Sequence, residues 1–255
     1  TSYPAATNQI LKSFIWSTVD PCPIKSISIS RGVDKTTWEY LSIFVRSPKC
    51  QLEHLLFEDI FQGSEDTEFI KALAENQSLV SLSYKNMAQC PDPSLAHVLF
   101  VTNTLQHLSL VNVCMDKYTC KQLAQGLELN RTVKELDISD NSGVDNSSMK
   151  KIIKSLIYNS SVKSLNVSNT NMNSDLAPQL VELFQVNKTL VNINLSGNML
   201  GDQTVLDIIA ALPSARSVKE LNLSSTGAYS SKVSDAINDF RKKNKRFDGS
   251  VVKIV

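Results

Sequence analysis

The sequence lacks the features that mark membrane-spanning, disulfide-stabilised or zinc proteins. No run of about 18 apolar residues occurs, so it predicts no membrane-spanning helix. The first residues, Thr1-Ser2-Tyr3-Pro4, lack the basic region and the apolar stretch of a signal peptide, and without an initiator methionine we expect a piece of a longer protein. The five cysteines, an odd number without a C-x-x-C pair, predict reduced and mostly buried thiols in a reducing compartment. They are Cys22, Cys50, Cys90, Cys114 and Cys120.

An excess of charge of one sign is also missing, which limits the partners that we expect. Lys and Arg total 26 against 25 Asp and Glu, so the net charge of +1 predicts no nucleic-acid partner. With 8 Gly, 8 Pro and 42% apolar residues, the composition excludes collagen-like and low-complexity classes. Phosphate-binding glycine motifs and the H-E-x-x-H zinc motif are absent as well. We therefore expect no catalysis, no cofactor and no bound metal.

What the sequence does contain is a short apolar triplet that recurs along its length. Each copy reads apolar-x-x-apolar-x-apolar, and successive copies begin 26 to 29 residues apart. Between copies the apolar spacing changes to that of an amphipathic helix, as in Met149, Ile152, Ile153 and Leu156. Each repeat is therefore predicted to be a strand, a loop and a helix. The triplets begin at Ile24, Leu52, Leu79, Leu105, Val133, Val162, Leu190 and Val218.

This pattern resembles the leucine-rich repeat of the ribonuclease-inhibitor type, which has the same period and the same L-x-x-L-x-L core. The resemblance covers residues 24–246. It implies an α/β solenoid of about eight repeats, with a curved parallel sheet inside and helices outside. We expect a single domain in which residues 1–23 form a helical amino-terminal cap. Residues 247–255 are expected to form a cap strand in a truncated ninth unit that begins at Phe247.

Four asparagines lie three residues before a triplet, at Asn76, Asn130, Asn159 and Asn187. Because Asn tolerates the left-handed backbone conformation that ends helices, we interpret them as helix stops. All four belong to N-x-[ST] sequences, which are glycosylation acceptors in secreted proteins. The repeat accounts for seven of the eight such sequences, which favours a cytoplasmic protein over a secreted one. The other three that it accounts for lie in predicted strands, at Asn166, Asn194 and Asn222.

Alternation along each predicted strand places the residues between the apolar positions on the concave surface of the sheet. This surface is polar and lacks the large aromatic anchors of interaction hot spots. His54 and His107 are expected about 10 Å apart, too far for one metal ion. Glu135 and Asp137 form a charged centre that we interpret as a protein contact. The candidate partner-binding residues are His54, Glu58, Lys85, His107, Glu135, Asp137, Asn166, Asn194 and Glu220.

Five cations gather within six residues at the end of the last predicted helix. Cations suit the negative end of the helix dipole. They also suit an acidic protein partner or an anionic membrane surface. This basic cluster consists of Arg241, Lys242, Lys243, Lys245 and Arg246.

Within the leucine-rich repeat class, the sequence resembles cytoskeletal repeats of the CARMIL and tropomodulin kind. The resemblance is carried by phrases such as Ser109-Leu110-Val111-Asn112 and Asn187-Lys188-Thr189-Leu190. It implies a non-catalytic cytoplasmic scaffold that acts on actin or its capping machinery. The repeats are also similar to GTPase-activating proteins of the Ran type, for which Arg31 is the candidate loop arginine, and to the ligand-sensing arrays of innate-immune receptors.

Overall fold

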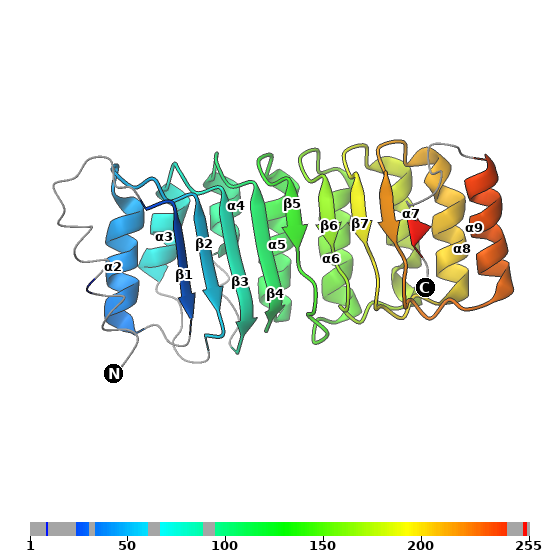
Figure 1. Cartoon of the computed structure of the whole chain (residues 1–255), viewed down its shortest axis with the longest axis horizontal. Coiled ribbons are helices and arrows are strands. Elements are labelled where there is room, and N and C mark those ends of the chain that lie inside the picture. The colour runs from blue at the N-terminus through cyan, green and yellow to red at the C-terminus, as the bar shows by residue number, and fades with distance from the viewer. Residues whose placement is uncertain are drawn as a thin grey trace.

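The computed structural model describes residue 9 and residues 24–30, 34–60, 67–88, 95–243 and 252–253. Within these residues, the strands form one sheet in which all neighbours run parallel and the spatial order equals the chain order (Figure 1). The strands are β1 (Ser26–Ser30), β2 (His54–Glu58), β3 (Ser81–Met87), β4 (His107–Val113), β5 (Glu135–Asp137), β6 (Ser164–Asn166), β7 (Asn192–Asn194), β8 (Glu220–Asn222) and β9 (Val252–Lys253).

A helix follows each strand from β1 to β8 and returns the chain to the start of the next strand. The helices are α2 (Lys35–Arg46), α3 (Thr67–Glu75), α4 (Leu95–Val101), α5 (Lys117–Leu129), α6 (Asn146–Ile157), α7 (Ala177–Val186), α8 (Gly201–Ala211) and α9 (Ser231–Lys243). Two 3₁₀ turns, η1 (Ser174–Leu176) and η2 (Leu212–Ser214), flank α7 and α8.

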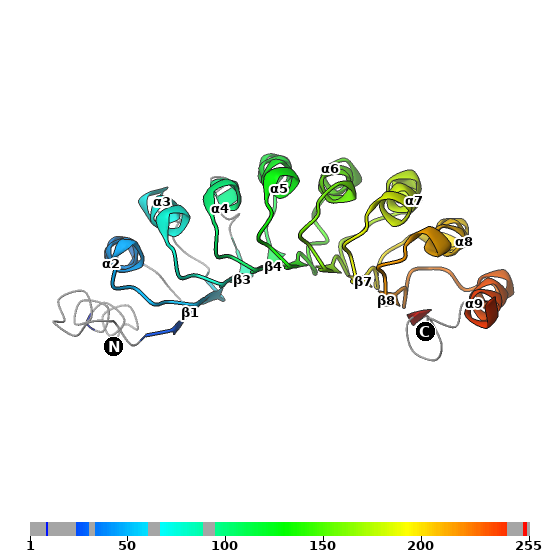
Figure 2. The same cartoon turned by 90° about the horizontal axis from the view of Figure 1, so that it is seen from above.

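The two layers form an arc, with the sheet on its inner, concave side and the helices on its outer, convex side (Figure 2). The arc arises because the helices are wider than the strands: helices pack about 8–10 Å apart, whereas parallel strands lie about 4.8 Å apart. The predicted α/β solenoid is thereby confirmed. The short strand β9 lies beside β8 at the end of the sheet. The expected start of the last unit at Phe247 and the amino-terminal cap lie outside the described residues.

The core lies between the two layers and contains the apolar residues of the triplets. In the sixth repeat, Val162, Leu165 and Val167 are at most 1% exposed, and they belong to the same buried cluster as Ile152 and Leu156 of α6. Burying one such side chain stabilises the fold by about 1.5–3 kcal/mol. The amino-terminal part of the core is aromatic, with ring centroids 4.9–5.7 Å apart. Its rings belong to Trp38, Phe57, Phe69 and Tyr84.

Aspartates begin several of the helices as N-caps. The Asp116 carboxylate accepts the backbone N–H of Thr119 at 2.7 Å, and Asp145 accepts that of Ser148 at the same distance. These hydrogen bonds hold the pKa of both carboxyl groups below the ordinary value. Asp34 caps α2 in the same way. An Asp three residues before Ser or Thr therefore fixes where these helices start.

The four asparagines before the triplets do not act through a left-handed backbone, which corrects our interpretation of them. Asn130 and Asn187 have extended backbones, with φ of −65°. Their side chains are buried instead, and the Oδ1 atom of Asn130 accepts the N–H groups of Thr132 and Val133. Its Nδ2 donates to the carbonyl of Leu99 in the preceding repeat, at 2.8 Å. Each asparagine thus joins two repeats through backbone groups that would otherwise be buried without partners.

Strand length changes abruptly between β4 and β5, from seven residues to three. In β5 the carboxylate of Asp137 accepts the N–H of Ser139, and in β6 Asn166 does the same for Ser168. Such side-chain turns compete with the sheet for backbone donors and end the strand. The corresponding residue in β4 is Ser109, for which no such turn forms among the described residues, and β4 continues to Val113.

A second buried asparagine compensates for the shorter strand. The Nδ2 atom of Asn141 donates to the carbonyl of Leu110 at 2.7 Å, and its Oδ1 accepts the N–H of Val113 at 2.9 Å. Asn198 makes the same bridge from its repeat to the carbonyl of Val167. These side-chain amides therefore supplement backbone pairs that continue beyond the short strands, such as the N–H of Asp140 with the carbonyl of Ser168.

Candidate interaction surface on the concave face

The parallel register aligns the candidate residues in rows that run across the concave face. The first row pairs His54 with Ser81, Ser81 with His107, and His107 with Glu135. It continues through Ser164 and Asn192 to Glu220. The second row contains Asp137, Asn166 and Asn194, and the third contains Glu58, Lys85 and Val111.

His107 and Glu135 face each other across β4 and β5. The Nδ1 atom of His107 lies 2.9 Å from Oε2 of Glu135, and both side chains remain partly exposed. His54 lies two strands from His107 in the same row, with Ser81 between them. No group of three His, Cys, Asp or Glu side chains suited to a metal ion occurs among the described residues.

Asp137 does not act as a pair with Glu135, although both carboxylates lie on one strand. Its Oδ2 accepts the Nδ2 of Asn166 at 3.1 Å, while its Oδ1 accepts the N–H of Ser139. Glu135 is directed to His107 in the neighbouring strand. The two acids therefore have different partners, and Glu135 is the one that solvent reaches more freely.

A contact between opposite charges lies on β2 and β3. The Nζ atom of Lys85 lies 3.4 Å from Oε1 of Glu58. Two half-buried apolar side chains accompany it on the concave face: Leu56 lies two residues before Glu58, and Val111 is the register partner of Lys85. From β2 to β5 the surface thus offers both charges and apolar contact area.

The asparagines of the carboxyl-terminal strands are engaged by their own backbone. Oδ1 of Asn194 accepts both the N–H and the hydroxyl of Ser196, at 3.1 and 2.7 Å. Asn166 does the same with Ser168. Glu220, at the far end of the first row, is exposed.

Sequence reasoning missed a polar ladder at the carboxyl ends of the strands. Its members have positive φ and side chains that bond from one repeat to the next: Nδ2 of Asn112 donates to Asn86 at 2.9 Å, and that of Asn169 donates to Asp140 at 2.7 Å. The sequence did contain a signal for this ladder: an Asp or Asn lies four positions after the second apolar residue of each of these triplets. Asp and Asn tolerate the left-handed backbone conformation, which has positive φ. This edge ladder consists of Asp59, Asn86, Asn112, Asp140 and Asn169.

The basic cluster is described only in part. Arg241, Lys242 and Lys243 form the last turn of α9, where Lys242 lies 4.0 Å from Asp239. Lys245, Arg246 and the candidate loop residue Arg31 lie outside the described residues.

The cysteines partly follow the prediction of buried, reduced thiols. Cys50 and Cys120 are buried, whereas Cys114 is exposed. The other two, Cys22 and Cys90, lie outside the described residues. Among the helices that the structure describes, none has the length and apolar character needed to cross a membrane.

Comparison with known proteins gives repeat proteins of the expected kind. No family model matches the chain. The human NACHT, LRR and PYD domains-containing protein 13 is 28% identical over 169 residues, which are 65% of this chain and 16% of that protein. The chain therefore spans a small part of this curated relative. The class follows from the fold: strand, loop and helix units repeat along one parallel sheet and are joined by buried asparagines. The chain is a leucine-rich repeat protein.

Two solved structures match just over half of this chain. The tropomodulin C-terminal domain from Caenorhabditis elegans is 16% identical with a TM-score of 0.48, over 55% of this chain and 83% of that one. The leiomodin-1 actin-binding site 2 is 18% identical with a TM-score of 0.48, over 55% of this chain and 80% of that one.

Proposed function

We propose that this leucine-rich repeat array is a non-catalytic protein-interaction domain whose binding site is the concave face from β2 to β5. The observation that carries this proposal is the division of the concave face into two parts. From β2 to β5, charged side chains point to solvent beside Leu56 and Val111. From β6 to β8, the asparagine oxygens are occupied by neighbouring serines. The contacts of Lys85 with Glu58 and of His107 with Glu135 are exposed and contribute little to stability, so a partner can replace them at small cost.

Within this site, His107 and Glu135 provide the central recognition contact. A partner that covers them removes water from the contact between the imidazole and the carboxylate, so the loss of one member raises the dissociation rate. The basic cluster at the end of α9 serves a different purpose in the proposal, since exposed rim charges chiefly increase the association rate. An acidic partner is captured at that end and is recognised at the centre.

The narrower proposal is that the array belongs to a larger cytoplasmic actin-regulatory or signalling protein. The repeat phrases that resemble cytoskeletal leucine-rich repeats support it. None of the comparisons supports the anionic membrane surface that the basic cluster suggested as an alternative partner.

A second candidate is a ligand-sensing array within a multidomain innate-immune receptor. The 28% identity with a NACHT, LRR and PYD protein is the specific observation that favours it. A third candidate, the GTPase-activating activity for which Arg31 was considered, has no support among the described residues. Measuring GTP hydrolysis by a panel of GTPases with and without the chain separates this activity from a binding role.

The concave site is tested with purified actin and with lysate proteins that the unmutated chain captures reproducibly. We expect Glu135→Lys/Asp137→Lys to abolish binding of the specific partner at both low and high salt. The variant Lys242→Glu/Lys243→Glu should slow association at low salt only, because salt screens rim charges. A matched control is Glu220→Lys, which changes an exposed acid outside the proposed site. If the central variant binds every partner as the original chain does, the concave proposal is wrong.

A further inference from the structure

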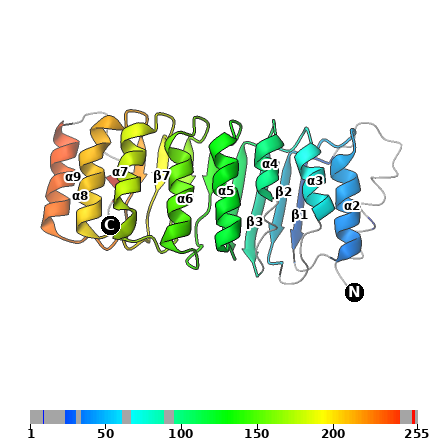
Figure 3. The ribbon, with the colours of Figure 1, turned by 180° about the vertical axis from the view of Figure 1, so that it is seen from behind.

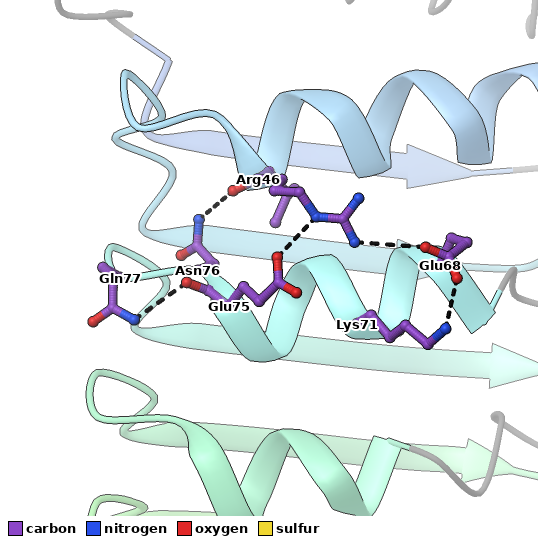
Figure 4. A network of polar contacts seen from close by, with 7 residues as sticks. Arg46, Glu68, Lys71, Glu75, Asn76 and Gln77 are labelled. Atoms are coloured by element: carbon purple, nitrogen blue, oxygen red, sulfur yellow. Dashed lines mark hydrogen bonds and ion pairs between the residues drawn. The ribbon is translucent and has the colours of Figure 1, made fainter.

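The convex helices differ sharply in how their charges are compensated. At the amino-terminal end, cations and carboxylates of α2 and α3 form a network (Figure 4). The Nε atom of Arg46 lies 2.8 Å from Oε2 of Glu75, and Nζ of Lys71 lies 2.7 Å from Oε1 of Glu68. The Lys71 contact holds the pKa of the Glu68 carboxyl below its ordinary value. This part of the surface has little charge to offer to a partner.

In the middle of the array, α5 and α6 carry lysines without such partners. Four exposed lysines on these two helices have no carboxylate within ion-pair distance among the described residues, although Lys117 reaches Asp145 at 3.2 Å. The two helices are neighbours at the centre of the helical layer (Figure 3). The four lysines, named here the lysine group, are Lys121, Lys150, Lys151 and Lys154.

Exposed apolar side chains accompany the lysine group on the same side of the helices. At about 100° per residue, Lys150, Lys151, Lys154 and Tyr158 fall within an arc of about 100° around the α6 axis. Tyr158, directly after α6, is 75% exposed. One repeat earlier, Leu129 at the end of α5 holds the equivalent position and is 63% exposed. The surface thus combines positive charge with two apolar contacts about 12 Å further along the helices.

The next helices bound this positive surface with negative charge. Neither α7 nor α8 contains a Lys or Arg, whereas Glu182 lies on α7 and Asp202 and Asp207 lie on α8. An acidic ligand is therefore attracted to α5 and α6 and repelled by the helices that follow. This change of sign fixes both the position and the extent of the attractive region.

We propose that the convex surface of α5 and α6 docks an acidic protein segment that carries apolar anchors. Its carboxylates would contact the lysine group, and its apolar side chains would pack on Leu129 and Tyr158. A peptide can cross two neighbouring helices, whereas the outward curvature of the layer (Figure 2) lets a flat bilayer touch few of them. This site is separate from the concave face and stands independently of the function proposed for it.

The test measures binding of a fluorescein-labelled peptide in which glutamates alternate with leucines and phenylalanines, by anisotropy. We expect Lys121→Glu/Lys150→Glu/Lys154→Glu to weaken binding at least about tenfold at low salt. We expect Leu129→Ser/Tyr158→Ser to weaken it as well, chiefly through faster dissociation. A peptide with the same charge and serines in place of the apolar residues should bind the original chain more weakly.

A matched control variant, Lys163→Glu/Lys219→Glu/Lys232→Glu, changes three exposed lysines outside α5 and α6 by the same total charge. If it weakens binding as much as the lysine-group variant does, the attraction depends on net charge alone and the proposal is wrong. Failure of the peptide to bind, or binding that the lysine-group variant leaves unchanged, overturns it too. So does lysine-dependent binding to phosphatidylserine vesicles in place of the peptide, or self-association of the chain through this surface. Glu135→Lys/Asp137→Lys should leave peptide binding unchanged, which separates this proposal from the concave one.

Discussion

The first four strands and the next four solve the same structural problem in different ways. In β1 to β4, strands of five to seven residues pair through their backbones over an aromatic core. In β5 to β8, each strand has three residues, and the buried side chains of Asn141 and Asn198 add hydrogen bonds to the backbone pairs that continue past the strands. The difference depends on one concave position, where Leu or Ser gives way to Asp or Asn. A single side chain that bonds its own backbone thus decides how far a strand extends.

This contrast also separates structural from functional polar groups. The side-chain oxygens of the asparagines in β6 to β8 accept hydrogen bonds from neighbouring serines. The uniform polar character of that surface therefore does not make it a binding surface. The amino-terminal part satisfies its backbone by strand pairing and leaves its charged side chains to solvent. Similar compositions in the two regions therefore have different consequences for binding.

The largest effect is expected from a charge placed in the core of either region. Leu165→Asp and Leu82→Asp each bury an unpaired carboxylate at a position at most 1% exposed, at a cost of several kcal/mol. If the two regions form one cooperative array, both variants lose all structure in a single transition, as followed by circular dichroism during urea unfolding. A variant that retains a stable half, detected by limited proteolysis, would show that the regions fold separately.

The asparagine bridges provide a sharper comparison. Asn141→Leu leaves the N–H of Val113 and the carbonyl of Leu110 without their partner, so we expect a loss of about 2–4 kcal/mol in the free energy of unfolding. Met87→Leu changes the equivalent position of β3, where the backbone pairs directly with β4. We expect this control to cost less than about 1.5 kcal/mol. Equal losses would contradict the bridging role of Asn141.

A glycine at the edge of the carboxyl-terminal region tests the tightness of its turns. Gly197 has φ of 67°, and a Cβ there would lie 1.7 Å from Oδ1 of Asn169. Gly197→Ala is expected to cost about 1–3 kcal/mol, and Asn169→Ala in the same chain should relieve the steric part of that loss. Gly143→Ala is the control, because its Cβ would meet nothing within 4 Å. Equal thermal stability of the two glycine variants would contradict the close approach of Asn169 to position 197.

Smaller effects are expected at the residue that ends β5. Asp137→Ser introduces the residue type found at this position in β4 and removes the acceptor for the N–H of Ser139. We expect faster hydrogen exchange at Ser139 and a loss of less than about 1 kcal/mol. Ser109→Asp, the reverse exchange in β4, should draw the N–H of Val111 away from strand pairing and speed hydrogen exchange at the end of β4. An unchanged exchange rate in both variants would refute the role of this side chain in strand length.

The smallest effect concerns pH and the N-caps of α5 and α6. The folded pKa values of Asp116 and Asp145 lie below the ordinary value of 3.8, so each cap stabilises the fold above that pH. This contribution is lost as the pH falls through the folded pKa. Asp116→Asn keeps a capping side chain but does not titrate, so its stability should approach that of the original chain as the pH falls below 3.8. A difference between the two that does not change with pH would contradict the assignment.

The repeat and its orientation could be predicted because periodicity depends on burial. Leu136, Leu165 and Ile193 recur at a fixed spacing since each must reach the same core, and their positions decide which neighbours face the concave side. Strand length could not be predicted in this way. It depends on whether Asp137 or Asn194 turns to its own backbone, and alternation alone does not distinguish such a side chain from one that points to solvent.

The mechanism of the asparagines before the triplets was predicted wrongly for a related reason. Asn130 fits both a left-handed turn and a buried bridge, and the choice depends on carbonyls of the preceding repeat such as that of Leu99. This carbonyl lies 31 residues before Asn130 in the sequence, so the residues next to Asn130 do not indicate it. The compensation of charge between neighbouring helices was also beyond the sequence, since Arg46 of α2 meets Glu75 of α3 only once the two helices are placed side by side.

The buried asparagines have a consequence for production of the protein in secretory hosts. Glycosyl transfer at N-x-[ST] sequences joins the sugar to the same Nδ2 atom that donates to the preceding repeat in Asn76, Asn130, Asn159 and Asn187. In a chain that enters the secretory pathway unfolded, folding therefore competes with glycosylation of these asparagines. Each sugar attached before folding removes one of the links between repeats and leaves no room for its own bulk. Expression in a host that does not glycosylate avoids this competition. Removal of the sugars under native conditions does not restore the fold of a chain that was glycosylated before it folded.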